Sequence, residues 1–237
     1  MDEETKRYID ERFQRIIDQI ESNYIKVNGR IEADEIDCVG DITAGAAQIG
    51  DGTNYANIAS DGEITLAGTA RVKKEFAISP SDYNPGASGP TAALQGGFES
   101  YEFTINDDMY ASFEVPYDWD SSTDITIEVY WGIDEAYATN SAEVQWYVDW
   151  YAVAEGEDVT SPGNTGNIDF GDVNIPATAN TLVKTEGTIA AASLSSGDIV
   201  SLHGSRVALD GGNNPTAEPY IIQIHVEYTS NNLGEAT

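Results

Sequence analysis

Apolar and polar residues alternate through the second half of this chain, and this period limits how it can fold. Ile125, Ile127 and Val129 are separated by polar residues, and the same two-residue step returns in 144–150 and 222–228. In the last of these runs the predicted buried face consists of Ile222, Ile224, Val226 and Tyr228. Successive side chains of a strand point to opposite faces, so this period is typical of strands with one buried and one wet face.

About eight such runs follow one another, with no helical pattern among them. They are Phe98–Ile105, Met109–Val115, Asp124–Gly132, Ala142–Ala154, Asn167–Ile175, Thr181–Ala192, Asp198–Leu209 and Pro219–Tyr228. Eight antiparallel strands in about 130 residues fit a jelly roll or a related sandwich. We predict a jelly-roll-like β-sandwich head domain over residues 98–237 of a mainly β protein.

The first thirty residues have a different period. Apolar side chains recur at alternating steps of four and three, which predicts a coiled-coil helix over residues 1–30. The stripe consists of Ile9, Phe13, Ile16, Ile20 and Val27. Isoleucine at d-type positions disfavours a simple dimer and a phenylalanine needs a roomy core, so we predict a parallel homotrimer.

Between the helix and the head, turn dipeptides recur about every ten residues. Residues 31–78 are predicted to be a neck of short strands that pack against symmetry mates, because strands this short bury little apolar area alone. Residues 79–97 contain three prolines and four glycines and are predicted to be a linker.

Acidity narrows the class of partner. The net charge is −30, and the first thirty residues contribute only −1 of it, with six basic and seven acidic side chains. Such a surface repels phosphate backbones and anionic lipids, so we expect neither nucleic acid nor a membrane surface as a partner. Acids dispersed among aromatics in a foldable chain indicate a halophilic source.

Targeting and cysteine signals are sparse. No apolar run approaches the ~18–20 residues of a membrane span, and the start of the chain lacks the pattern of a cleaved signal peptide. Cys38 is the one cysteine, which excludes an internal disulfide framework and a cysteine-based zinc cluster.

Several segments, in this order, resemble the neck and head of tailed-virus fibre and head-fibre proteins. They are Ile49–Ile58, Asp61–Ala70, Ala111–Asp120, Ile125–Trp131, Glu143–Tyr151, Arg206–Asp210 and Ile222–Tyr228. Relatives often carry histidines beside the strand corresponding to Val129–Trp131. This chain has none there, so a metal or ligand role for them is not carried over.

The resemblance implies a trimeric virion surface protein, and the acidity indicates a virus of a halophilic archaeon. We therefore predict a homotrimeric fibre, turret or spike subunit on the virion surface, for host attachment or capsid decoration. The helix would dock on other virion proteins, and the head would meet a host glycan or glycoprotein. The alternative is a carbohydrate-binding module of a halophile cell-surface assembly.

Aromatic and amide side chains in the expected loops are the candidates for receptor contact, because loops on a rigid sandwich often carry recognition. They are Trp119, Tyr137, Asn140, Asn213 and Asn214. Tyr130, Tyr147 and Tyr151 lie out of phase with the tryptophans and could form an outward patch, as a subunit interface or a sugar-stacking platform.

Catalysis has little support in the sequence. His203 and His225 fall on the polar phase of their strands, and no nucleophile elbow lies near them. Carboxylate pairs that could cleave glycosides are plentiful by chance among 41 acids. We expect no enzyme, no catalytic residues and no bound cofactor, although a glycan hydrolase stays open as a third class.

Calcium is the one metal that the sequence suggests. Asp51–Asn54 and Asp210–Asn214 are oxygen-rich loops suited to a hard cation, but neither has the full EF-hand pattern. Whether a metal is bound is therefore an open question at this stage.

The charge distribution predicts stabilisation by salt. Residues 31–237 carry −29, so screening of their repulsion should raise the melting temperature steadily from low to molar chloride. Thermal unfolding followed by circular dichroism checks this. A flat or falling melting temperature over that range would remove the argument for a halophilic source.

Overall fold

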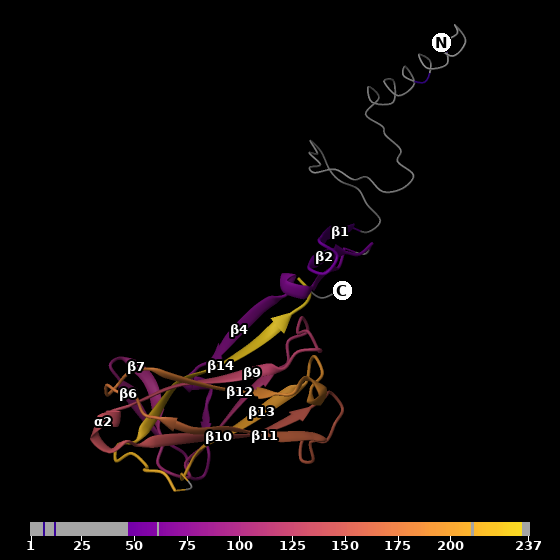
Figure 1. Ribbon diagram of the computed structural model, residues 1–237. Helices are drawn as coiled ribbons and strands as arrows, with labels where there is room; N and C mark the ends of the chain where they lie inside the picture. The colour runs from indigo at the N-terminus through magenta and orange to yellow at the C-terminus, as the bar shows by residue number, and fades with distance from the viewer. Residues whose placement is uncertain (1–6, 8–11, 13–46, 61, 210, 234–237) are drawn as a thin grey trace. The chain divides into compact units, whose positions relative to one another are not determined.

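The computed structural model describes residues 7, 12, 47–60, 62–209 and 211–233, without the side chains of residues 139 and 140 (Figure 1). Arg7 and Arg12 are helical. The predicted coiled-coil stripe, Ile9, Phe13, Ile16, Ile20 and Val27, lies outside the described residues, as does the neck up to residue 46. The coiled coil and the homotrimer therefore stay predictions.

The described residues from 47 onward form fourteen strands, one short α-helix and three 3-10 turns. They are β1 (Ala47–Gly50), β2 (Tyr55–Ile58), β3 (Ile64–Ala67), η1 (Gly68–Ala70), β4 (Val72–Ile78), η2 (Pro80–Asp82), β5 (Asn84–Pro85), β6 (Thr91–Gln95), β7 (Phe98–Glu102), β8 (Asp108–Glu114), β9 (Ile125–Ile133), α2 (Tyr137–Asn140), β10 (Glu143–Val153), β11 (Asn164–Asn174), β12 (Val183–Ile189), η3 (Ala191–Ser193), β13 (Ile199–Val207) and β14 (Pro219–Ser230). None of the described helices is long and apolar enough to cross a membrane.

The strands pair antiparallel in three sheets. The small sheet has the order β1-β2-β3, and the five-stranded sheet the order β11-β10-β13-β8-β5. The six-stranded sheet has the order β12-β9-β14-β7-β6, with β4 also paired to β14. The prediction of a mainly β sandwich is confirmed.

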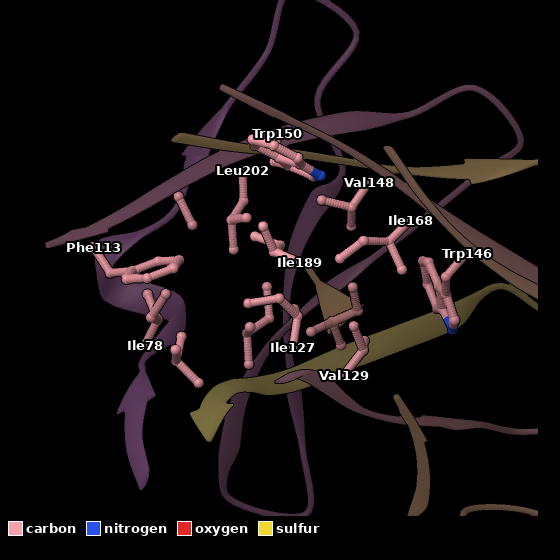
Figure 2. Close-up of a cluster of buried hydrophobic side chains, with 14 of the residues drawn as sticks. Ile78, Phe113, Ile127, Val129, Trp146, Val148, Trp150, Ile168, Ile189 and Leu202 are labelled. Carbon is pink, nitrogen blue, oxygen red and sulfur yellow. The ribbon is translucent and has the colours of Figure 1, made fainter. Parts of the chain in front are cut away.

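The core lies between the five-stranded and six-stranded sheets (Figure 2). Every second residue of β10 from Val144 to Ala152 is buried, as the alternation predicts. Trp146 of β10 is 2% exposed and meets Trp131 of β9 and Phe103 edge to face, with ring centroids 6.0 and 5.2 Å away. Such T-shaped contacts add to the area that the rings bury.

Residues 72–97 differ from the predicted neck and linker. Strand β4 pairs with β14 from Val72↔Ser230 to Ile78↔Ile224, and β5 and β6 extend the two sheets. Prolines usually signal loops, but a proline is tolerated where a strand need not donate a hydrogen bond, such as the edge position of Pro85 in β5. Most of the predicted linker therefore belongs to the sandwich.

Replacement of the central indole tests the packing. Trp146→Ala should lower the free energy of unfolding by about 3–5 kcal/mol, because the side chain is fully buried between the sheets. Urea unfolding of the full chain measures it. Tyr151→Ala, on the outer face of the same strand and 39% exposed, should cost about 1 kcal/mol or less. Equal losses in the free energy of unfolding for Trp146→Ala and Tyr151→Ala would contradict this account of the core.

Candidate functional site

An open groove of about 850 Å³ lies on the outer face of the six-stranded sheet. Its walls come from β9, β14, the β6–β7 hairpin and the segment leading into β12. The lining residues are Gln95, Gly96, Phe98, Tyr130, Gly132, Asp134, Asn180, Leu182, Tyr220, Ile222, Gln223 and His225. The volume is within the usual range for a small-molecule site, about 300–1,000 Å³.

A β-bulge in β14 brings the floor of the groove together. The register with β9 shifts between Ile221 and Gln223, so Ile221 and Ile224 both face the core although they are three residues apart. Ile222 lines the groove instead. Our prediction that Ile222 shares the buried face of this strand is therefore wrong, because the extra residue reverses the alternation locally.

One end of the groove is a chain of polar groups. The Asn180 amide donates to Asp134 Oδ1 at 2.8 Å, and the Tyr220 hydroxyl donates to Asn180 Oδ1 at 3.0 Å. Burial raises the pKa of Tyr220, and the charge of Asp134 adds to this, so the phenol stays protonated. A Cβ atom at residue 132 would lie only 2.7 Å from the hydroxyl oxygen of Tyr220. The Tyr220 ring can therefore occupy this place because residue 132 is a glycine.

At the other end, an aromatic pair is held by an ion pair beneath it. The Tyr130 and His225 rings lie 4.6 Å apart, and the Tyr130 hydroxyl donates to Glu128 Oε2 at 2.9 Å. Lys184 donates to Glu128 Oε1 at 2.7 Å. Burial by itself would raise the pKa of Glu128, but hydrogen bonds from Lys184 and Tyr130 outweigh it and hold the pKa below its usual value.

The same cluster has some of the features of a metal site. Ligand atoms of Glu75, Glu128 and His225 lie within 4.8 Å of one another. Both oxygens of Glu128 already accept hydrogen bonds, one of them from the Lys184 ammonium. A cation would have to displace that ammonium, so the donor set does not fit a resident metal well.

The remaining wall is apolar and exposed. Phe98 and Leu182 are 62% and 55% exposed. Phe98 follows the tight β6–β7 turn, where Gly96 and Gly97 have φ of 58° and 101°, the left-handed conformation that two-residue hairpin turns need. The groove thus combines an exposed ring with amide, phenol and carboxylate groups. It can hold a ligand that has both apolar faces and hydroxyl groups.

The residues predicted to contact a receptor are only partly brought together. Trp119 is 3% exposed and donates from its indole to the Thr123 carbonyl at 3.0 Å, so it belongs to the core and does not face a receptor. The expectation failed because an aromatic in a tight turn can fold inward as readily as outward. The side chain of Asn140 lies outside the described residues.

Tyr137 is 36% exposed, Asn213 is exposed and Asn214 is half-buried. Their two loops are tied together through Glu135, whose carboxylate accepts from the Thr216 and Ala217 amides at 2.7 and 2.9 Å. None of the three lines the groove, but Asp134 of the first loop does.

The three out-of-phase tyrosines do not form one patch. Tyr130 lies on β9 of the six-stranded sheet, whereas Tyr147 and Tyr151 lie on β10 of the five-stranded sheet. Because the two outer faces point away from each other, only Tyr130 contributes to the groove.

The predicted calcium loops are only partly described. Asp51 Oδ1 accepts from the amides of Thr53 and Asn54 at 2.9 and 2.6 Å, and these bonds close its own turn. Hydrogen bonds from Asn54 and Thr53 lower the pKa of Asp51. Asp210 lies outside the described residues. Asp51 thus stabilises its own turn through these hydrogen bonds, which need no cation.

Phe98, Leu182, Asn180 and Gln223 were not singled out from the sequence. The two glycines before Phe98 were the available signal, since they predict a hairpin tip that exposes its flanking residues. No local pattern marks Asn180 or Gln223, because the bulge and the pairing of distant strands bring them to the groove.

No protein-family model matches the chain, and no curated protein matches it. Similar solved structures include the family 36 carbohydrate-binding module CBM36 in complex with calcium and xylotriose, at 14% identity and a TM-score of 0.35 over 64% of this chain and 98% of that one. Another is the xylan-binding domain CBM22-2 from Paenibacillus barcinonensis Xyn10C, at 10% identity and a TM-score of 0.38 over 66% of this chain and 98% of that one.

A third is the CBM22-1–GH10 part of xylanase 10B from Clostridium thermocellum complexed with xylohexaose, at 9% identity and a TM-score of 0.37. That match covers 65% of this chain and 28% of the xylanase. Likenesses at this level do not place the chain in a family.

These comparisons contradict the predicted function. The similar structures described above are carbohydrate-binding modules or contain one, and none is a virion protein. The prediction of a virion fibre, turret or spike subunit is therefore wrong, whereas the predicted homotrimer is not tested by these comparisons. The alternative that the sequence left open, a carbohydrate-binding module of a halophile cell-surface assembly, is not contradicted by these comparisons.

The ion pair beneath Tyr130 predicts a pH dependence. The folded-state pKa of Glu128 is lowered, so its contribution to stability is present above its unfolded pKa near 4.5 and is lost as pH falls through the folded value. The difference in melting temperature between the wild type and Glu128→Gln should therefore shrink from pH 7 to pH 3. Glu186→Gln, which removes the exposed partner of Lys184, should change stability by about 0.5 kcal/mol or less. If the difference in melting temperature between the wild type and Glu128→Gln does not change with pH, the ion-pair account is refuted.

Proposed function

We propose that the protein binds carbohydrate without catalysis, and that the groove on the six-stranded sheet holds a segment of a glycan chain. The observation that carries the proposal is the meeting, in one open groove, of an exposed apolar wall with a row of amide, phenol and carboxylate groups. We also infer that the two facing sheets form a jelly roll.

Sugars present flat faces of C–H groups and edges of hydroxyl groups. Phe98 offers an exposed ring to such a face, and Asn180 and Gln223 offer amides. Each amide both donates and accepts, which suits hydroxyls that do the same. The Asp134–Asn180–Tyr220 chain fixes its groups before binding, so little ordering would be needed when a ligand arrives.

The charge of the groove favours a neutral glycan. None of the described lining residues is lysine or arginine, and Asp134 is acidic. A chain of net charge −30 also repels uronate or sulfate groups at long range. We therefore expect a preference for uncharged polysaccharides.

A binding role is favoured over hydrolysis by the carboxylates at the groove. Among its described lining residues, Asp134 alone carries one, and its Oδ1 is bound to Asn180. Glycoside cleavage usually needs two carboxyl groups about 5–9.5 Å apart across the scissile bond. Calcium stays a hypothesis that the metal content of purified protein can test.

Affinity electrophoresis through gels that contain xylan, mixed-linkage β-glucan or galactomannan tests the proposal, followed by calorimetry with an oligosaccharide of the retarding type. Wild-type protein should be retarded by at least one of them. Phe98→Ala should weaken binding at least tenfold, or about 1.4 kcal/mol, because it removes the stacking ring.

Leu94→Ala is the matched control, since Leu94 lies on the same hairpin, is 68% exposed and does not line the groove. It should bind as the wild type does. If none of the three polysaccharides retards the protein, or if Phe98→Ala and Leu94→Ala lose affinity equally, the groove is not the glycan site. Shortening of the oligosaccharide over time would overturn the non-catalytic role.

A further inference from the structure

The small sheet β1-β2-β3 has no buried side chain. Every described residue from 47 to 72 is exposed or half-buried, whereas most strands of the sandwich contain buried residues. Each of its strands has four residues. A sheet this small needs a hydrophobic face packed against another element to be stable. Among the described residues, that packing is incomplete.

Main-chain hydrogen bonds tie this sheet to the end of β14. The Leu66 amide donates to the Asn231 carbonyl, and the Leu233 amide donates to the Ile64 carbonyl at 3.1 Å. These bonds fix the position of β3 but bury little apolar surface. Ile58, Ile64 and Leu66 stay half-buried.

Large apolar side chains are exposed beside them. Ile49, Val72 and Leu233 are 65%, 41% and 58% exposed. Val72 pairs with Ser230 and Leu233 bonds to Ile64, so both lie where β14 meets the small sheet. The region therefore presents apolar side chains that burial would stabilise by about 25 cal/mol per Å².

The low charge of this region indicates what can cover it. Residues 47–72 contain three acidic residues and one basic residue, in a chain of net charge −30. Two copies of such a chain repel each other over most of their surface and can approach where the charge is small. The first thirty residues, which also carry almost no net charge, have a heptad stripe suited to self-association.

We propose that the small sheet, with Val72 and Leu233, is an interface between copies of this chain, and that a second copy completes its hydrophobic burial. The inference does not depend on glycan binding, because none of these residues lines the groove.

Disulfide trapping in the full chain tests the interface. In a Cys38→Ser background, Ile49→Cys should form covalent dimers under mild oxidation at least tenfold faster than Val159→Cys. Val159 is the matched control because it is 74% exposed and lies on the sandwich. Equal rates would overturn the proposal.

Sedimentation equilibrium supplies a second measurement. The full chain should associate, and Ile49→Asp should raise the concentration for half-association at least tenfold while Val159→Asp leaves it unchanged. Ile49 is exposed within the chain, so its replacement should not unfold the protein, and an unchanged circular dichroism spectrum confirms this. A monomer at all concentrations, or equal effects of the two variants, would refute the interface.

Discussion

Strand β14 pairs with three other strands along its twelve residues, and this pairing constrains the rest of the structure. Its first half binds β9 and β7, and its second half binds β4 while still pairing with β9 as far as Glu227. The chain then continues along β3. One strand thus contributes to the core, to the floor of the groove and to the attachment of the small sheet. In Figure 1, β14 runs beside β4 from the sandwich toward β2.

The groove depends on local departures from regular sheet geometry. A bulge at Ile222 lets Tyr220 and His225 line the same groove, and Gly132 leaves room for the Tyr220 ring. The core beneath these features is well packed, with Trp131 and Ile133 fully buried on β9. A rigid layer of apolar side chains holds the polar groups in place, as is usual for binding sites built on sheets.

The groove and the small sheet offer different kinds of surface. The groove combines an exposed apolar wall with amide, phenol and carboxylate groups. The small sheet has few charges and no buried side chain among its described residues. The first arrangement favours a hydroxyl-rich ligand and the second favours protein contact, so the two proposals rest on different physical features.

The sequence by itself determined the class of the fold and the inward residues of most strands. A two-residue period is a local property, so the buried faces of Val144–Trp150 and Ile224–Tyr228 could be predicted from neighbours in the chain. The inward position of Trp119, the bulge at Ile222 and the inclusion of β4 to β6 in the sandwich could not. Each depends on pairing or packing between residues far apart in the chain, as in the bonding of Asn180 to Asp134 and Tyr220. The alternation indicates which face of a strand is wet, but only the tertiary structure decided which wet faces meet to form a groove.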